Sequence, residues 1–115
     1  MMNRTLVAAV MILLSACDRP DTSEYRGPTG PLARVLVDSA GGVRLNGRAV
    51  TLAELADTFR VVGRDSGGVI YAREAPDRAP PPAQDSTIRG VLQLITRFRL
   101  PVQLVRPESL ATAGR

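Results

Sequence analysis

The sequence predicts an α+β domain in two layers, with a sheet of about five short strands and two helices on one face of it. Two observations carry this prediction. Short apolar segments alternate with polar residues and are separated by glycine-rich turns, which is typical of strands. Two longer segments, 52–62 and 88–98, instead repeat apolar residues at helical spacing. Each such helix has one apolar face to bury, and one side of a single sheet can bury both.

The first three strands are expected between residues 34 and 50. Residues 34–38 have an apolar centre, Val35-Leu36-Val37, with two β-branched residues, and Gly41-Gly42 then permits a chain reversal. Residues 43–45 alternate between apolar and charged. Asn46-Gly47 is the dipeptide best suited to a type I′ hairpin, so residues 48–50 should form the returning strand.

The first helix has the clearest local signal in the chain. Thr51 and Glu54 fit a capping box, in which each side chain satisfies a free backbone N–H of the other residue. The apolar stripe that follows consists of Leu52, Leu55, Ala56, Phe59 and Val62. Gly63 stands where a helix commonly ends.

The second half of the chain predicts a strand, a loop, a helix and a last strand. Residues 69–72 are apolar enough for a central strand, and the loop 74–86 contains four prolines. Asp85 or Ser86 could cap the second helix, whose apolar stripe is Ile88, Val91, Leu92, Ile95 and Phe98. Gly90 within this helix suggests close packing of a neighbour. Residues 100–105 are expected to form the last strand, and 108–115 a flexible tail.

The N-terminal segment is typical of a targeting signal. Arg4 precedes an uncharged apolar run over 6–14, which is too short to remain as a membrane-spanning helix. Leu14 to Cys17 resembles the lipobox of bacterial lipoproteins, which implies cleavage after residue 16 and acylation of Cys17. The alternative is an ordinary secretory signal that leaves Cys17 as a free thiol. Residues 17–31 are rich in Pro, Gly, Asp, Thr and Ser taken together, and we interpret them as a flexible tether.

These observations predict a lipid-anchored protein on the periplasmic side of a bacterial membrane. Several acyl chains hold a protein stably, whereas one alone holds only marginally. Asp18 resembles the signal that keeps enterobacterial lipoproteins in the inner membrane, so the inner membrane is favoured over the outer.

Composition argues against several other classes of protein. The chain has 115 residues, enough for one domain, and a net charge of +4. Its basic residues are all arginine and are scattered among acids, which does not favour a nucleic-acid partner. There is no histidine, and the single cysteine is assigned to lipid, so we expect no enzyme, metal or cofactor site.

Paired carboxylates are the remaining route to catalysis, as in glycosidases. The candidates nearest ordered elements are Asp38, Glu54, Asp57 and Glu74. We expect Glu54 to cap a helix, Asp57 to lie on a polar helix face and Asp38 to form a turn. A hydrolytic lipoprotein therefore ranks low.

Residues 33–106 resemble the periplasmic domain of the ExbD/TolR family. The resemblance rests on Val35 to Leu55, on the strand 69–73 and on the closing segment 88–105. It implies a binding domain of 32–107 that pairs with itself and works beside an ion-driven ExbB/ExbD- or Tol-like biopolymer transport complex. That family's proton-coupling Asp lies in an N-terminal transmembrane helix, and residues 1–16 contain no acid that could match it.

Two functions follow as expectations. The first is a non-enzymatic, lipid-anchored periplasmic binding module accessory to such a complex. The alternative is a cell-envelope structural lipoprotein that binds peptidoglycan. In that case Arg34, Arg44 and Arg48 would present positive charge to the acidic peptide stems from the sheet face away from the helices.

Overall fold

The structure is a computed structural model that describes residues 27–115. The predicted leader, the acylation of Cys17 and most of the tether fall outside the described residues. Within 27–115, neither helix has the length and apolarity that a membrane crossing requires.

The domain is a single five-stranded mixed sheet with two helices, as the sequence predicts. The strands are β1 (Leu32–Val37), β2 (Val43–Leu45), β3 (Arg48–Val50), β4 (Gly68–Arg73) and β5 (Val102–Leu104). They lie in the order β3-β2-β1-β4-β5. The hairpin strands pair antiparallel, whereas β1, β4 and β5 are parallel. Asn46 and Gly47 have φ angles of 51° and 87°, which fits the type I′ turn.

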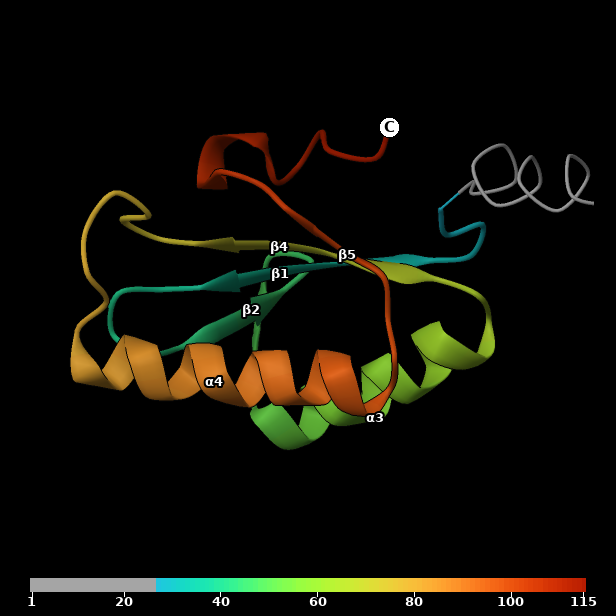
Figure 1. The fold of residues 1–115 in the computed structure, drawn as a ribbon, viewed down its shortest axis with the longest axis horizontal. Helices are drawn as coiled ribbons and strands as arrows, with labels where there is room; N and C mark the ends of the chain where they lie inside the picture. Colours follow the sequence, from blue (N-terminus) through green and yellow to red (C-terminus); the bar gives the residue numbers. More distant parts are fainter. Residues whose placement is uncertain (1–26) are drawn as a thin grey trace, which may run out of the picture.

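Both helices, α3 (Leu52–Arg64) and α4 (Pro82–Arg97), cover the same face of the sheet (Figure 1). We call this the inner face. Alternate residues of β1 are buried there, namely Ala33, Val35 and Val37. They form the core together with the fully buried side chains of Leu55, Phe59 and Val91. Leu52 of α3 packs against Gly90 of α4, which confirms the close approach expected there.

Helix α3 begins as predicted and ends slightly later. Thr51 and Glu54 form the capping box, with both hydrogen bonds at 3.1 Å. The helix runs through Gly63 to Arg64 and is capped by Asp65. The left-handed residue that closes it is Ser66, with φ of 60°, so the prediction that Gly63 ends the helix was wrong.

Helix α4 begins three to four residues before the predicted caps. It starts at Pro82, with Pro81 as N-cap, so the proline-rich loop ends at residue 81. Asp85 lies in the first turn, where its backbone N–H donates to the Pro81 carbonyl at 2.9 Å. Proline is well tolerated in a first helical turn because an N–H is unpaired there in any residue.

Two segments expected to be flexible are instead packed on the domain. The backbone N–H groups of Thr29 and Gly30 donate to the Ser66 carbonyl, and Gly68 donates to Pro31. The predicted tether therefore does not extend to residue 31. At the other end, Pro107–Ser109 form a short 3₁₀ helix, η1, and the chain beyond it lies over the outer face of the sheet (Figure 1).

One polar group of the core lacks a partner. Tyr71 is buried on the inner face of β4, and its hydroxyl oxygen has no hydrogen bond among the described residues. Its burial raises the pKa of the phenol. A buried hydroxyl without a partner costs roughly 1–3 kcal/mol.

We therefore expect Tyr71→Phe to raise the free energy of unfolding by about 1 kcal/mol, because it removes the hydroxyl and keeps the ring. Urea denaturation followed by circular dichroism would measure this change. A loss of stability in Tyr71→Phe would show that the hydroxyl has a partner in solution.

Candidate functional site

The free edge of β5 is the surface best placed to bind another chain. Among the strands of residues 27–115, β5 pairs with β4 alone. The carbonyl of Pro101 accepts from Val69, and the N–H of Val105 donates to Tyr71, both at 2.9 Å. Backbone groups of successive residues alternate in direction along a strand, so those of Val102 and Leu104 point away from the sheet.

All three side chains of β5 are exposed, and two of them are apolar. Val102 is 42% exposed and Leu104 is 70% exposed. Edge strands are usually protected by charged residues, proline or bulges. Residues 102–104 contain none of these, although Pro101 precedes them. The opposite edge strand, β3, carries Arg48.

A groove of about 380 Å³ lies beside the start of β5. Its lining includes the apolar side chains of Pro28, Leu32, Ile70 and Pro101. Val102 and Gln103 line it as well, so the groove is continuous with the free edge. Together the edge and the groove could take an extended apolar segment.

Arg34, the first of the three predicted partner-face arginines, is already occupied. It lies on the outer face, where its Nη1 donates to the carbonyls of Leu110 at 2.6 Å and Ala113 at 2.7 Å. These bonds fasten the C-terminal segment across the sheet. The prediction of a flexible tail missed these bonds. Their acceptors are backbone carbonyls, which every residue has, so the tail sequence carries no pattern that indicates them.

Arg44 and Arg48 do not share one face. Arg44 lies opposite Leu36, on the outer face, whereas Arg48 lies opposite the buried Leu45. Directly opposed residues of an antiparallel pair point to the same side of the sheet. Arg48 therefore points to the inner side at the β3 edge. The prediction that all three arginines lie on the sheet face away from the helices was therefore wrong for Arg48.

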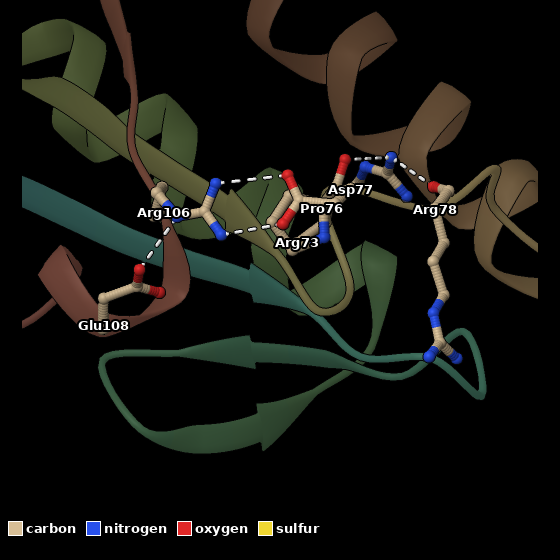
Figure 2. Close-up of polar contacts among 6 residues, drawn as sticks. All are labelled: Arg73, Pro76, Asp77, Arg78, Arg106 and Glu108. Atoms are coloured by element: carbon tan, nitrogen blue, oxygen red, sulfur yellow. Dashed lines mark hydrogen bonds and ion pairs between the residues drawn. The ribbon is translucent and has the colours of Figure 1, made fainter.

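A network of charges links the proline-rich loop to the C-terminal segment (Figure 2). Arg106 donates to Asp77 at 3.0 Å and to Glu108 at 2.8 Å. The hydrogen bond from Arg106 lowers the pKa of Asp77. The pKa of Glu108 is lowered by its own backbone N–H and then by Arg106.

Because both pKa values are lower in the folded chain than in the unfolded one, these contacts stabilise the fold above about pH 4. They are lost as the pH falls through the folded values. We expect the NMR amide signals of Arg106, Glu108 and Ser109 to shift on acidification below about pH 4. Those of Leu110 and Ala113 should stay, since the carbonyls of these two residues accept hydrogen bonds from Arg34 and no carboxylate takes part in that contact. Simultaneous loss of both sets would contradict this division.

A buried glutamine fixes the ends of the two central strands. Gln84 is fully buried, and its Nε2 donates to the carbonyls of Glu74 at 2.9 Å and Val37 at 3.4 Å. Arg73 donates to the Gln84 side chain. It also donates to the carbonyls of Pro76 and Arg78, as Figure 2 shows. Sequence reasoning missed this cluster, because its acceptors are mostly backbone atoms.

The candidate carboxylates each have a structural partner. Asp38 Oδ1 accepts from the N–H groups of Ala40 and Gly42, which closes the predicted turn. Glu54 caps α3, and Asp57 pairs with Arg60 at 3.3 Å. Glu74 accepts from the N–H of Ser39 at 2.8 Å. Among residues 27–115, no three carboxylates or other ligands gather where they could hold a metal ion.

No family model matches this sequence, and a search of curated proteins finds no significant match.

Proposed function

We propose that this protein is a non-enzymatic, lipid-anchored binding module on the periplasmic side of a bacterial membrane. It would serve as an accessory to an ExbB/ExbD- or Tol-like biopolymer transport complex. The observation that carries the binding role is the unprotected apolar edge of β5, with Leu104 70% exposed. The anchor rests on Cys17 and the apolar run before it.

The fold supports the resemblance as far as architecture goes. The sequence patterns predict a two-layer domain with both helices on one face over the residues that carry the ExbD/TolR resemblance, and the chain has this arrangement (Figure 1). The carboxylates considered for catalysis instead take part in a turn, a helix cap and an ion pair. This arrangement favours recognition over catalysis.

The binding mode that fits the edge is the addition of a strand. An extended segment of a partner would pair with the outward backbone groups of Val102 and Leu104. Its own apolar side chains would cover the exposed parts of these two residues. A second copy of the chain is one such partner, and a segment of a transport-complex subunit is another.

The peptidoglycan alternative is less well supported. Arg34 already holds two carbonyls of the C-terminal segment, and Arg48 points to the other side of the sheet from Arg44. Binding of acidic peptide stems would therefore rely on Arg44 without its predicted neighbours.

Co-purification from bacterial membranes tests the proposal. The full chain with a C-terminal tag should recover ExbB/TolQ-like or TonB/TolA-like proteins, and mass spectrometry of its mature N-terminus should find acylated Cys17. Consistent recovery of none of these partners would overturn the transport role. An unmodified Cys17 would overturn the anchor. Salt-sensitive retention on purified sacculi would favour the peptidoglycan alternative.

A further inference from the structure

The described chain enters the domain at one end of the sheet. The strands β1, β4 and β5 are parallel, so all three begin at this end, which we call the entry end. Thr29 and Gly30 are fastened here to Ser66. Both helices lead into these strands through short connections, so both helices also end here (Figure 1).

The entry end is positively charged. The C-terminal halves of the helices and the residues after them bring four exposed arginines toward it: Arg60, Arg64, Arg97 and Arg99. Two of these have an acid beside them. Arg60 pairs with Asp57 at 3.3 Å and Arg64 with Asp65 at 3.1 Å. Arg97 and Arg99 have no carboxylate within 4.0 Å among residues 27–115.

At the opposite end of the sheet, acidic residues outnumber arginines. Strands β1 and β4 end there, as does the loop into α4, and five carboxylates gather around four arginines. The carboxylates are Asp38, Glu74, Asp77, Asp85 and Glu108, and the arginines are Arg73, Arg78, Arg89 and Arg106. The domain is therefore polar along the strand direction, with its positive pole where the chain continues toward residue 26.

Local folding explains only part of the positive pole. Arg64 and Arg97 lie in the last turns of their helices, where a cation offsets the helix dipole. Arg99 lies beyond α4 with φ of 53°, at a position that glycine usually fills. The backbone conformation at this position therefore does not explain why the residue is arginine.

We propose that the entry end rests on the membrane surface, with Arg97 and Arg99 on the phosphates of anionic lipid head groups. This inference depends on the proposed lipid anchor. The ten residues from Cys17 to Arg26 span at most about 35 Å, so the anchor keeps this end close to the bilayer. A flexible tether restricts distance and not orientation, whereas cations within a Debye length of about 8 Å of an anionic surface also orient the domain. Strand β5 would then begin near the membrane surface and run away from it, roughly along the surface normal, with its free edge open to the side.

Fluorescence quenching in vesicles tests this orientation. The anchored full chain would be labelled at Thr96→Cys, near the entry end, or at Ala79→Cys, in the opposite loop. Both native side chains are exposed. The vesicles would contain nitroxide-labelled head groups in phosphatidylcholine, with or without phosphatidylglycerol. With phosphatidylglycerol, we expect stronger quenching at position 96 than at 79. In phosphatidylcholine alone or in high salt, the difference should disappear.

The charge-reversal variant Arg97→Glu/Arg99→Glu should lower the oriented population about tenfold or more. The matched control Arg78→Glu/Arg89→Glu makes the same change in charge at the opposite end and should keep the difference in quenching. Equal quenching at both positions in phosphatidylglycerol vesicles would overturn the proposal, as would an unchanged difference in Arg97→Glu/Arg99→Glu.

Failure of the anchor is recognised separately. The parent chain, whose only cysteine is Cys17, should take no maleimide label when that sulfur is acylated. If it takes the label, the anchor is wrong. The two positions are then compared in a Cys17→Ser background on vesicles containing phosphatidylglycerol, where equal quenching still overturns the orientation and stronger quenching at position 96 supports it.

Discussion

Replacing Phe59 by alanine is expected to lower the free energy of unfolding by about 3–5 kcal/mol. The ring lies on the buried face of α3 and has no exposed surface. Its removal forfeits the transfer free energy of the ring and leaves a cavity between α3 and the sheet. Small domains unfold with about 5–15 kcal/mol in total, so the variant should lose a large share of its stability.

Chemical denaturation of residues 27–115, followed by helical circular dichroism, would measure this loss. Val61→Ala is the matched control, because Val61 lies in the same helix and is 43% exposed. Its stability should change by no more than about 0.5 kcal/mol. A loss below about 1 kcal/mol for Phe59→Ala would mean that α3 does not pack on the sheet as described.

The second large effect is expected at the free edge. In Val102→Lys/Leu104→Lys, two apolar side chains that a partner strand would cover become charged. Burying a side chain of this size contributes about 1.5–3 kcal/mol, so the double variant should weaken partner binding at least 100-fold. Stability should change less than binding, because Leu104 is 70% exposed and Val102 42% exposed in the free domain.

The control for this variant makes the same replacement, of two apolar residues by lysine, on another surface of the domain. Val61→Lys/Leu92→Lys replaces two apolar residues of similar exposure on the helices, at 43% and 41%. Partner capture from membranes and sedimentation of the purified domain should be unaffected in this control. Equal loss of binding in both double variants would indicate a general effect of charge and not an edge-specific contact.

Leu104→Pro separates the backbone contribution from the side chains. The N–H of Leu104 points away from β4, and proline is tolerated on an edge strand at such a position. The fold should therefore remain while strand addition loses a hydrogen-bond donor. Retained binding in Leu104→Pro would favour a partner that contacts side chains only.

The sequence was most informative where the structure depends on local hydrogen bonding. The Thr51–Glu54 capping box and the Asn46-Gly47 turn formed as predicted, because each needs only residues close together in the chain. The helical stripes correctly predicted that both helices cover one face.

Features that depend on distant backbone atoms were not predictable. The C-terminal segment is held by a guanidinium 76 residues earlier in the chain, through carbonyls that any residue would supply. The buried Gln84 likewise satisfies carbonyls of β1 and of the residue after β4. The start of α4 was misplaced because a run of prolines resembles a loop, although proline is also favourable in a first helical turn.

Only part of the candidate binding surface was predictable from the sequence. The sequence predicts a strand around residues 100–105, but its place at the edge follows from the strand order, which no local pattern specifies. Exposure of Leu104 could therefore be recognised only in the folded arrangement.

Hydrogen–deuterium exchange at the β5 amides tests the central claim most directly. In the free domain, the amides of Val102 and Leu104 should exchange quickly, while the amide of Val105, bonded to Tyr71, should be protected. In the complex captured from membranes, Val102 and Leu104 should become protected at least tenfold, because a partner strand pairs with them. Unchanged exchange at both residues, with protection gained elsewhere on the domain, would contradict the account.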